Sequence, residues 1–258
     1  MELAPYDILR WHVEAGADEA IGEVPVDRFA TSAKPAAAPP LPSPRPAAEP
    51  REQAPRAVVP GTSAHQAAEA VDLAALRAAM EAFDGLPLKA AATSTVFGDG
   101  NPEASVMCIG EAPGQDEDRL GVPFVGVSGK LLDRMLASIG LDRGSAYITN
   151  ILPWRPPANR KPTPDEVAVC LPFLSRHIEL VDPQVLVLFG GAAASALLAR
   201  GEGINRLRGR WFEYSSPGLP RPIPAIATFH PAYLLRTPDA KREAWKDLLM
   251  VRKRLDGC

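Results

Sequence analysis

Short runs of consecutive apolar residues alternate along this chain with longer stretches whose apolar residues recur every three or four positions. The first pattern predicts buried strands, and the second predicts helices that present one apolar face. The predicted strands cover residues 106–109, 146–151, 185–190 and 223–229. The predicted helices cover residues 71–83, 127–140, 163–180, 191–198 and 240–255. Because this alternation is typical of a parallel sheet covered on both faces, we predict an α/β fold: a three-layer α/β/α sandwich with a central, mainly parallel, four-stranded sheet.

Capping and turn residues mark several boundaries of these elements. Asp72 precedes the apolar stripe of the helix over 71–83. Thr163 precedes a proline and is followed three residues later by Glu166, which is typical of a capped helix start. Residues 86–92 are predicted as a connector, and residues 97–102, rich in Gly, Asp, Asn and Pro, as a turn.

The N-terminal part of the chain has a different composition from the rest. Many of the 28 prolines fall between residues 33 and 61, where Pro, Ala, Arg, Glu and Ser dominate and no apolar period is present. Such a segment cannot bury enough surface to offset its chain entropy. Before it, residues 5–21 predict one amphipathic helix. We therefore expect an acidic amphipathic helix within 1–30, a Pro/Ala-rich disordered linker over 31–68 and a folded domain over 69–258.

Polar residues follow the ends of the predicted strands. Glu111 comes just after the first strand, Asn150 ends the second and His230 follows the fourth. Right-handed crossovers place the carboxyl ends of parallel strands at one rim of the sheet, so these side chains are expected to converge there. Each also has an ordinary explanation, since an asparagine can cap a turn and a histidine before Pro231 can be a structural hydrogen-bonding residue.

The loop after the first strand is rich in carboxylates. It contains Glu111, Asp116, Glu117 and Asp118, and it leads to Phe124. Acids at a strand end, followed by an aromatic side chain, predict a pocket with polar chemistry and a stacking wall. An ordinary solvated turn, with the phenylalanine in the core, is the alternative.

Charge is distributed unevenly along the chain. The net charge of −3 argues against a general polyanion binder. Residues 1–30 nevertheless hold seven acidic and two basic residues, whereas residues 201–258 hold eleven basic and six acidic ones. A basic face of this kind fits a phosphate backbone, although a solvated helix surface is the simpler explanation for the last helix.

Cysteines and apolar runs indicate the compartment. Cys108, Cys170 and Cys258 are too few and too scattered for a disulfide scaffold. We see no secretion signal, membrane-spanning run or lipidation motif, and we expect a reducing cytoplasm.

Several motifs carry a resemblance to a known family. They are Gly110-Glu111-Ala112-Pro113-Gly114 with Glu117-Asp118, then Pro123-Phe124-Val125-Gly126, Ile148-Thr149-Asn150, and His230-Pro231 with Tyr233-Leu234-Leu235-Arg236. In this order over residues 83–256, they resemble the motifs of the type-four uracil-DNA glycosylases of bacteria and archaea. The resemblance implies hydrolysis of the N-glycosidic bond of flipped-out deoxyuridine in DNA, as in base excision repair.

The resemblance also implies roles for individual residues. Phe124 would stack on the base, Asn150 would read the O4 and N3–H edge of uracil, and His230 would donate to O2 as the base leaves. Glu111 and Glu117 would orient or activate water or stabilise the sugar cation, with their division of labour left open. The remaining substrate-binding residues would be Gly110, Ala112 and Asp116.

DNA contacts are implied for the segment after the last strand. Tyr233 or Leu234 would fill the gap left by the flipped base, and Ala232 stands where the family usually has serine, which removes a hydroxyl donor to phosphate. The other expected DNA contacts are Arg155, Arg160, Lys161, Arg208, Pro231 and Arg236.

One departure from the family concerns metal. Type-four enzymes usually hold an iron–sulfur cluster through four cysteines, whose positions align here with Phe83, Leu86, Trp154 and Cys170. Since one thiolate cannot hold a four-iron cluster, we expect a protein without it, in which Cys170 is a small buried hydrophobic residue. A related branch captures its product covalently on a histidine in the loop after the second strand. Residues 153–164 contain no histidine, so we expect turnover without an adduct.

Two other functions remain open at this point. One is a weakly active or inactive DNA-binding relative with a regulatory role, in which the acidic N-terminal helix binds the basic face or a protein partner. The other is a glycosylase for another deaminated base, hypoxanthine or xanthine. In each case we expect a monomer that binds DNA and does not associate with a membrane.

Overall fold

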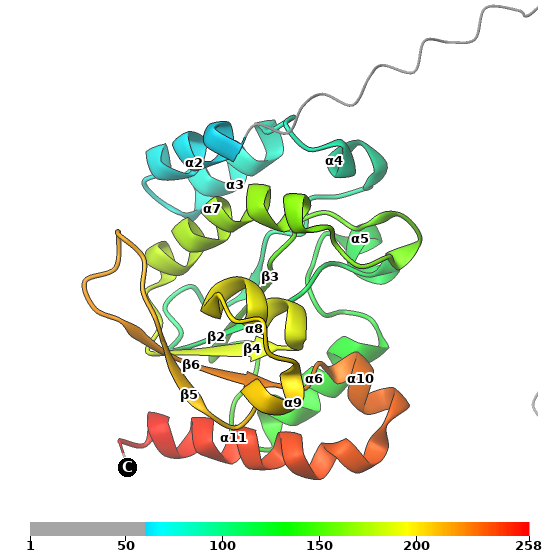
Figure 1. Cartoon of the computed structure of the whole chain (residues 1–258), viewed down its shortest axis with the longest axis vertical. Helices are drawn as coiled ribbons and strands as arrows, with labels where there is room; N and C mark the ends of the chain where they lie inside the picture. The colour runs from blue at the N-terminus through cyan, green and yellow to red at the C-terminus, as the bar shows by residue number, and fades with distance from the viewer. Residues whose placement is uncertain (1–59, 258) are drawn as a thin grey trace, which may run out of the picture. The chain divides into compact units, whose positions relative to one another are not determined.

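The computed structural model describes residues 60–257. The predicted helix over 5–21 and most of the predicted linker lie outside this range. The described residues form a six-stranded mixed sheet with strand order β1-β3-β2-β4-β6-β5 and helices on both faces (Figure 1). The predicted three-layer α/β/α class is therefore confirmed.

Four parallel strands form the centre of the sheet. They are β2 (Val106–Gly110), β3 (Ala146–Asn150), β4 (Val185–Phe189) and β6 (Ile223–Thr228). Nearly all their residues are buried, as expected for strands covered on both faces.

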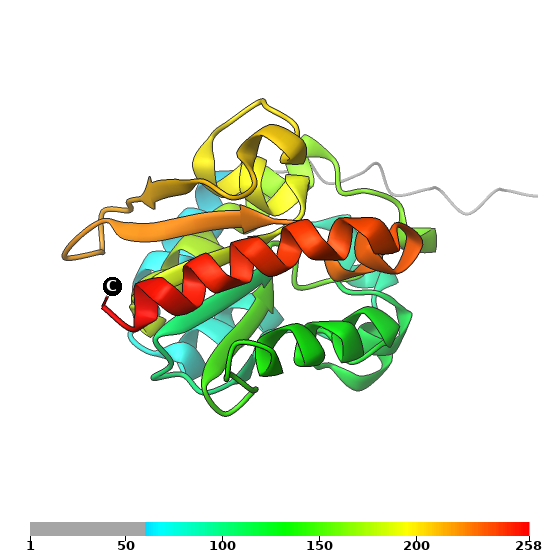
Figure 2. The same cartoon turned by 90° about the horizontal axis from the view of Figure 1, so that it is seen from below.

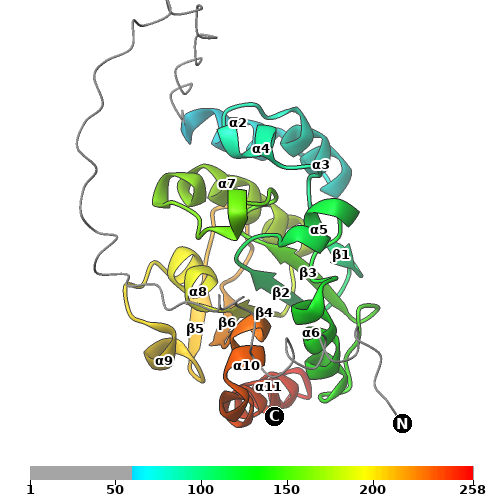
Figure 3. The same ribbon diagram turned by 90° about the vertical axis from the view of Figure 1, so that its right-hand side faces the viewer.

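Two antiparallel edge strands were not predicted, so the expectation of a four-stranded sheet is wrong in number. β1 (Asp99–Gly100) pairs with β3, and β5 (Trp211–Tyr214) pairs with β6 (Figure 3). β1 spans only two residues within the predicted turn, and β5 is partly exposed. Neither strand therefore carries the continuous apolar run by which the central strands were found.

One helical layer covers the first face of the sheet. It contains α2 (Pro60–Glu69), α3 (Leu73–Ala82), α7 (Pro164–Val181) and α8 (Gly191–Leu198). Their apolar residues join one core cluster with Leu186 and Leu188 of β4.

A second layer covers the opposite face. α6 (Val127–Ala137), α10 (Pro231–Arg236) and α11 (Lys241–Leu255) pack there, with α11 lying alongside β6 (Figure 2). Val185, Val187 and Phe189 of β4 belong to this second cluster. Successive β4 residues thus alternate between the two cores, as strand geometry requires.

Within residues 60–257, five short helices lie in the connections. They are α4 (Pro87–Ala91), α5 (Gln115–Leu120), η2 (Pro157–Asn159), α9 (Ile204–Leu207) and η3 (Pro238–Ala240). Across residues 60–257, no helix is both long and apolar enough to span a bilayer.

The folded part begins earlier in the chain than the sequence suggested. α2 occupies the end of the predicted linker and packs on α7, with Ser63 and Ala67 buried. Alanine has the highest helix propensity, and small side chains allow two helices to approach closely, so this segment folds without a strong apolar stripe. The linker prediction is therefore wrong for residues 60–68.

The capped boundaries agree with the sequence prediction. The Asp72 side chain accepts a hydrogen bond from the Ala75 N–H at the start of α3. Thr163 and Glu166 form a reciprocal capping box at the start of α7. Both helices are thus fixed by local side-chain chemistry as well as by packing.

Candidate active site

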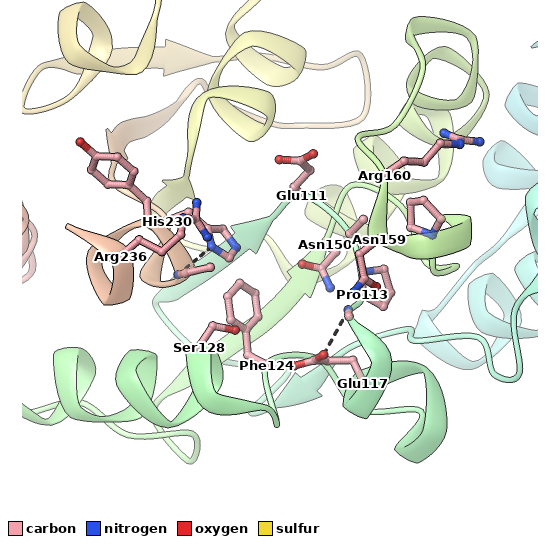
Figure 4. Close-up of a pocket in the computed structure, with 15 residues that line it drawn as sticks. Glu111, Pro113, Glu117, Phe124, Ser128, Asn150, Asn159, Arg160, His230 and Arg236 are labelled. Carbon is pink, nitrogen blue, oxygen red and sulfur yellow. Dashed lines mark hydrogen bonds between the residues drawn. The ribbon is translucent and has the colours of Figure 1, made fainter. Parts of the chain in front are cut away.

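A cavity of about 450 Å³ opens where the parallel strands end, which is a typical size for a small-ligand site (Figure 4). Its lining residues are Glu111, Ala112, Pro113, Gly114, Glu117, Phe124, Ser128, Asn150, Pro156, Asn159, Arg160, His230, Ala232, Tyr233 and Arg236. Glu111, Asn150 and His230, which lie at the ends of three different strands, do line one cavity.

His230 stands between β6 and α10, as the N-cap residue of that helix. Its Nδ1 accepts a hydrogen bond from the Ala232 N–H at 3.1 Å. Burial, reinforced by the Arg236 charge, lowers the pKa of His230 to about 4. The ring is therefore neutral near pH 7, and since Nδ1 is the acceptor, its proton resides on Nε2.

Phe124 forms an aromatic wall of the cavity. Its ring stacks on the His230 ring with centroids 5.5 Å apart and an interplanar angle of 28°. It also packs against Phe189 at the end of β4, with centroids 6.3 Å apart. The ring is fixed by neighbours from β4 and from the segment after β6.

Asn150 is the last residue of β3 and is only 5% exposed. Its Nδ2 has no hydrogen-bond partner among the described residues. Leaving a buried amide unpaired is unfavourable, so this group is poised for a ligand atom. Gly110, paired with Asn150 across the sheet, backs this corner, because a Cβ there would overlap the Asn150 amide and the Phe124 ring.

Glu111 follows β2 and is partly buried at the cavity. No described residue forms a hydrogen bond or ion pair with its carboxylate. Burial raises the pKa of Glu111, and the nearby Lys161 charge opposes that rise. The carboxylate is thus free to contact water or a ligand.

Glu117 is held very differently. Its Oε1 accepts hydrogen bonds from the N–H groups of Val125 and Gly126, at 3.0 and 2.9 Å. Its Oε2 accepts one from the Gly114 N–H at 3.1 Å, and the residue is 7% exposed. With three main-chain donors on its two oxygens, Glu117 acts as a clamp between α5 and the Phe124 loop.

The acidic loop predicted after β2 is largely helix α5. Asp116 points outward from it, with a side chain 54% exposed and 3.5 Å from Arg119, and it does not line the cavity. Asp118 is buried and accepts hydrogen bonds from the N–H groups of Thr93 and Ser94. The prediction that Asp116 contributes to the pocket is not supported by this geometry.

The predicted phosphate contacts fall into two groups. Arg160 and Arg236 line the cavity, whereas Arg155 and Lys161 lie outside its lining. Arg208 forms a fork with Asp247, its Nε 3.0 Å from Oδ2, and its side chain is only 15% exposed. The prediction of Arg208 as a phosphate contact is therefore wrong, because this guanidinium neutralises a buried acid.

Comparison with known proteins identifies the family. The sequence profile described as the uracil DNA glycosylase superfamily matches residues 97–249 of the chain. The chain belongs to the uracil DNA glycosylase superfamily. The resemblance found in the motifs is thus confirmed.

Similar proteins of this superfamily come from archaea and bacteria. The chain is 43% identical to the type-4 uracil-DNA glycosylase of Archaeoglobus fulgidus over 163 residues, which cover 62% of this chain and 81% of the relative. It is 36% identical over 184 residues to the type-4 uracil-DNA glycosylase of Pyrobaculum aerophilum, covering 70% and 93%. The type-4 uracil-DNA glycosylase of Thermotoga maritima is 41% identical over 151 residues, covering 58% and 76%.

The segment that the superfamily resemblance assigned to DNA insertion is helix α10. Leu234 is 1% exposed and belongs to the core between α6 and α11, so the prediction that it enters DNA is wrong. Tyr233 and Leu235 are 36% and 41% exposed. Pro231 is buried at the first turn of α10, and Ala232 lines the cavity.

The iron–sulfur cluster expected of type-four members was tested against the residues at its implied ligand positions. Phe83, Leu86, Trp154 and Cys170 are all at most 3% exposed and share one apolar core. The Phe83 and Trp154 rings stack with centroids 6.3 Å apart. Burial raises the pKa of the Cys170 thiol to about 12, which disfavours the thiolate that iron requires. These residues do not fit a cluster, and residues 60–257 hold no other group of metal-binding side chains.

Some lining residues were not among the predicted site residues. They are Pro113, Gly114, Ser128, Pro156 and Asn159. Ser128 lies in the first turn of α6, close to the Phe124 loop, and Asn159 accepts a hydrogen bond from Arg155 Nε at 2.7 Å. Pro113 and Gly114 belong to the motif after the first predicted strand, which could have indicated them, whereas Ser128, Pro156 and Asn159 lie away from any predicted strand end and carry no such signal.

Proposed function

We propose that this chain is a uracil-DNA glycosylase, which hydrolyses the bond between uracil N1 and deoxyribose C1′ of a nucleotide flipped out of DNA. The observation that carries this proposal is the buried Asn150 amide, whose Nδ2 has no partner among residues 60–257 and which lines the same cavity as Phe124 and His230. Membership of the uracil DNA glycosylase superfamily supports the same reaction.

Base recognition would depend on Asn150 and Phe124. The asparagine amide supplies a donor for uracil O4 and an acceptor for N3–H, whereas cytosine presents an amino group and an unprotonated N3. Leaving the amide unpaired against the wrong base costs about 1–3 kcal/mol. Stacking on the Phe124 ring offsets part of the cost of unstacking the base from the helix.

Cleavage would depend on His230. As the C1′–N1 bond breaks, its electron pair moves into the base and negative charge collects on O2. The neutral His230 ring can donate its Nε2–H to that oxygen. Removing one such positioned donor typically costs about 2.7–4 kcal/mol of transition-state stabilisation.

Glu111 would act on the water molecule. Its carboxylate has no partner among the described residues, whereas Glu117 already accepts three main-chain hydrogen bonds that hold it in a structural role. We therefore assign Glu111 to orient the water and accept its proton as the water oxygen bonds to C1′. No residue of the chain bonds covalently to the sugar in this scheme.

Tyr233 and two arginines are proposed to hold the DNA. Tyr233 is the exposed aromatic at the mouth of the cavity and would occupy the space left by the flipped base. Arg236 would contact a phosphate beside it. Arg160 forms a fork with Glu166, but its side chain is 43% exposed, unlike that of Arg208, and it would contact a second phosphate from that position. One chain supplies all the lining residues of the cavity, so a monomer would suffice for the reaction. Its DNA substrate would be that of the nucleoid, in the cytoplasm.

The proposal also includes catalysis without an iron–sulfur cluster. Purified protein should contain no stoichiometric iron, should lack visible cluster absorbance and should keep its activity after treatment with a chelator. The packed ring pair of Phe83 and Trp154 supports this expectation. A brown protein with bound iron would contradict it.

Base release from oligonucleotides tests the function. Single- and double-stranded substrates carrying uracil, hypoxanthine or xanthine would be incubated with the parent protein, Asn150→Ala, His230→Ala and Asn205→Ala. We expect release of uracil by the parent, a loss of about 5–150-fold in Asn150→Ala and a loss of about 100-fold or more in His230→Ala. Asn205→Ala, which alters an exposed asparagine outside the cavity lining, should stay near the parent. Release of hypoxanthine or xanthine instead would indicate the other base class, and no release would favour a DNA-binding role.

A further inference from the structure

The backbone of Phe124 has an uncommon conformation. Its φ angle is 55°, in the left-handed region that bulky side chains rarely adopt. Such a conformation persists only where surrounding groups over-determine it, and it often occurs at functional sites. Since Phe124 is the proposed stacking wall, the groups that hold its backbone determine where the base can bind.

Arg143 contacts this backbone from the connection between α6 and β3. Its Nη2 donates a hydrogen bond to the Phe124 carbonyl oxygen, and its Nη1 donates one to the Pro123 carbonyl oxygen at 3.2 Å. Two successive carbonyl groups are thereby held by one planar guanidinium. Lysine cannot reproduce this fork, because its ammonium group is a single point.

Two carboxylates fix Arg143 itself. Nη1 lies 2.6 Å from Asp99 Oδ2 on the edge strand β1, and Nε lies 2.9 Å from Asp133 Oδ1 on α6. The guanidinium is therefore anchored on both sides, with a side chain 27% exposed. Its orientation towards the Phe124 loop is set before any ligand arrives.

The other side of the loop is held by different groups. Glu117 accepts the N–H groups of Val125 and Gly126, directly after Phe124. Gly129 lies against the Phe124 carbonyl group, where a Cβ would overlap it. Arg143 thus completes a clamp that acts on both peptide groups of Phe124.

We propose that Arg143 is a positioning residue for base binding, which acts on the reaction through the backbone of Phe124. This inference rests on the proposed function, since it requires the base to stack on Phe124. Arg143 itself does not line the cavity. The competing explanation is that Arg143 only cross-links β1 and α6 and stabilises the fold.

A double-mutant comparison separates the two explanations. Single-turnover release of uracil at saturating DNA would be measured for the parent, Arg143→Lys, Phe124→Ala and the double variant. We expect Arg143→Lys to lower the rate by about 10-fold or more, because small displacements of a positioning group are costly. In the Phe124→Ala background the same substitution should change the rate less than 2-fold, and DNA affinity should change little in either background.

Arg176→Lys is the matched control. Arg176 likewise joins a main-chain carbonyl group, that of Ala70, to a carboxylate, that of Glu179, but it does so in the layer of α2 and α7. We expect its rate to equal that of the parent, even if its melting temperature falls as much as that of Arg143→Lys. An equal rate loss in Arg176→Lys would overturn the proposal.

A milder variant covers the case in which Arg143→Lys folds poorly. Asp99→Asn keeps the side-chain shape but weakens one anchor of the guanidinium, and it should give a smaller rate loss that also vanishes in the Phe124→Ala background. An undiminished loss in that background, or an unchanged rate in both Arg143→Lys and Asp99→Asn, would overturn the proposal. Failure of the parent to release uracil would instead refute the proposed function.

Discussion

The titratable residues of the cavity are held in different electrostatic states. His230 is kept neutral because burial lowers its pKa to about 4, while burial raises the pKa of Glu111 above its ordinary value of 4.5. A carboxylate that must accept a proton from water loses that capacity at a higher pH than an ordinary glutamate would.

The pH dependence of the single-turnover rate should follow Glu111. We expect the rate to fall on acidification with an apparent pKa above 4.5. Glu111→Gln should lose about 10²–10⁴-fold in rate and should lack this acid limb. A limb at pH 4 or below in the parent, or the same limb in Glu111→Gln, would contradict the assignment.

The helices and strands differ in how well the sequence predicted them. The central strands and α8 were predicted closely, because continuous apolar runs and small residues leave few alternatives. α5 was missed because its six residues are mostly charged and polar, and its order depends on distant partners such as Thr93, which binds Asp118. The sequence did not decide whether Tyr233 or Leu234 would enter the DNA, because that depends on the orientation of α10. In this helix Leu234 faces the core and Tyr233 faces outward.

The start of α6 provides a prediction at the scale of an element. Alanine normally stabilises a helix by about 1 kcal/mol relative to glycine. Gly129→Ala should instead lower the melting temperature and reduce the single-turnover rate by about 10-fold or more, because a Cβ there overlaps the Phe124 carbonyl group. Gly201→Ala is the control, since no atom lies within 4 Å of its added Cβ. A Gly129→Ala protein as stable and active as the parent would show that the Phe124 loop can shift freely.

The stability of the folded domain depends on how the core that contains Phe83, Trp154 and Phe173 is packed. Phe83 packs against Trp154 and Phe173, with the Phe173 centroid at 5.3 Å, in the region where the resemblance implied metal ligands. Apolar packing there must supply the stability that metal ligation would otherwise give. The cost of removing each side chain should then follow its buried volume and how far the surrounding core can close around the gap.

Denaturant unfolding tests this account of the core. Phe83→Ala should lower the free energy of unfolding by about 3–5 kcal/mol, as is usual for a buried aromatic residue. Cys170→Ala removes one sulfur atom and should cost only about 1 kcal/mol, with activity near that of the parent. The reverse order of the two losses, together with bound iron in the parent, would indicate that Cys170 is a ligand.

The extent of the catalytic unit is the last feature that the structure makes testable. All lining residues of the cavity fall within residues 111–236, and α2 packs on α7, with Arg176 Nε bonded to the Ala70 carbonyl group at 2.9 Å. A chain that begins at residue 60 should therefore keep the parent's single-turnover rate at saturating DNA, whereas one that begins at residue 73 should lose stability. The DNA affinities of the full chain and of the chain that begins at residue 60, measured at two salt concentrations, would also show whether the acidic residues of 1–30 weaken phosphate contacts. The slope of log affinity against log salt concentration depends on the number of phosphate contacts, so the shorter chain would then have the steeper slope. A large loss of rate on removing only residues 1–59 would mean that the catalytic unit extends into the N-terminal part of the chain.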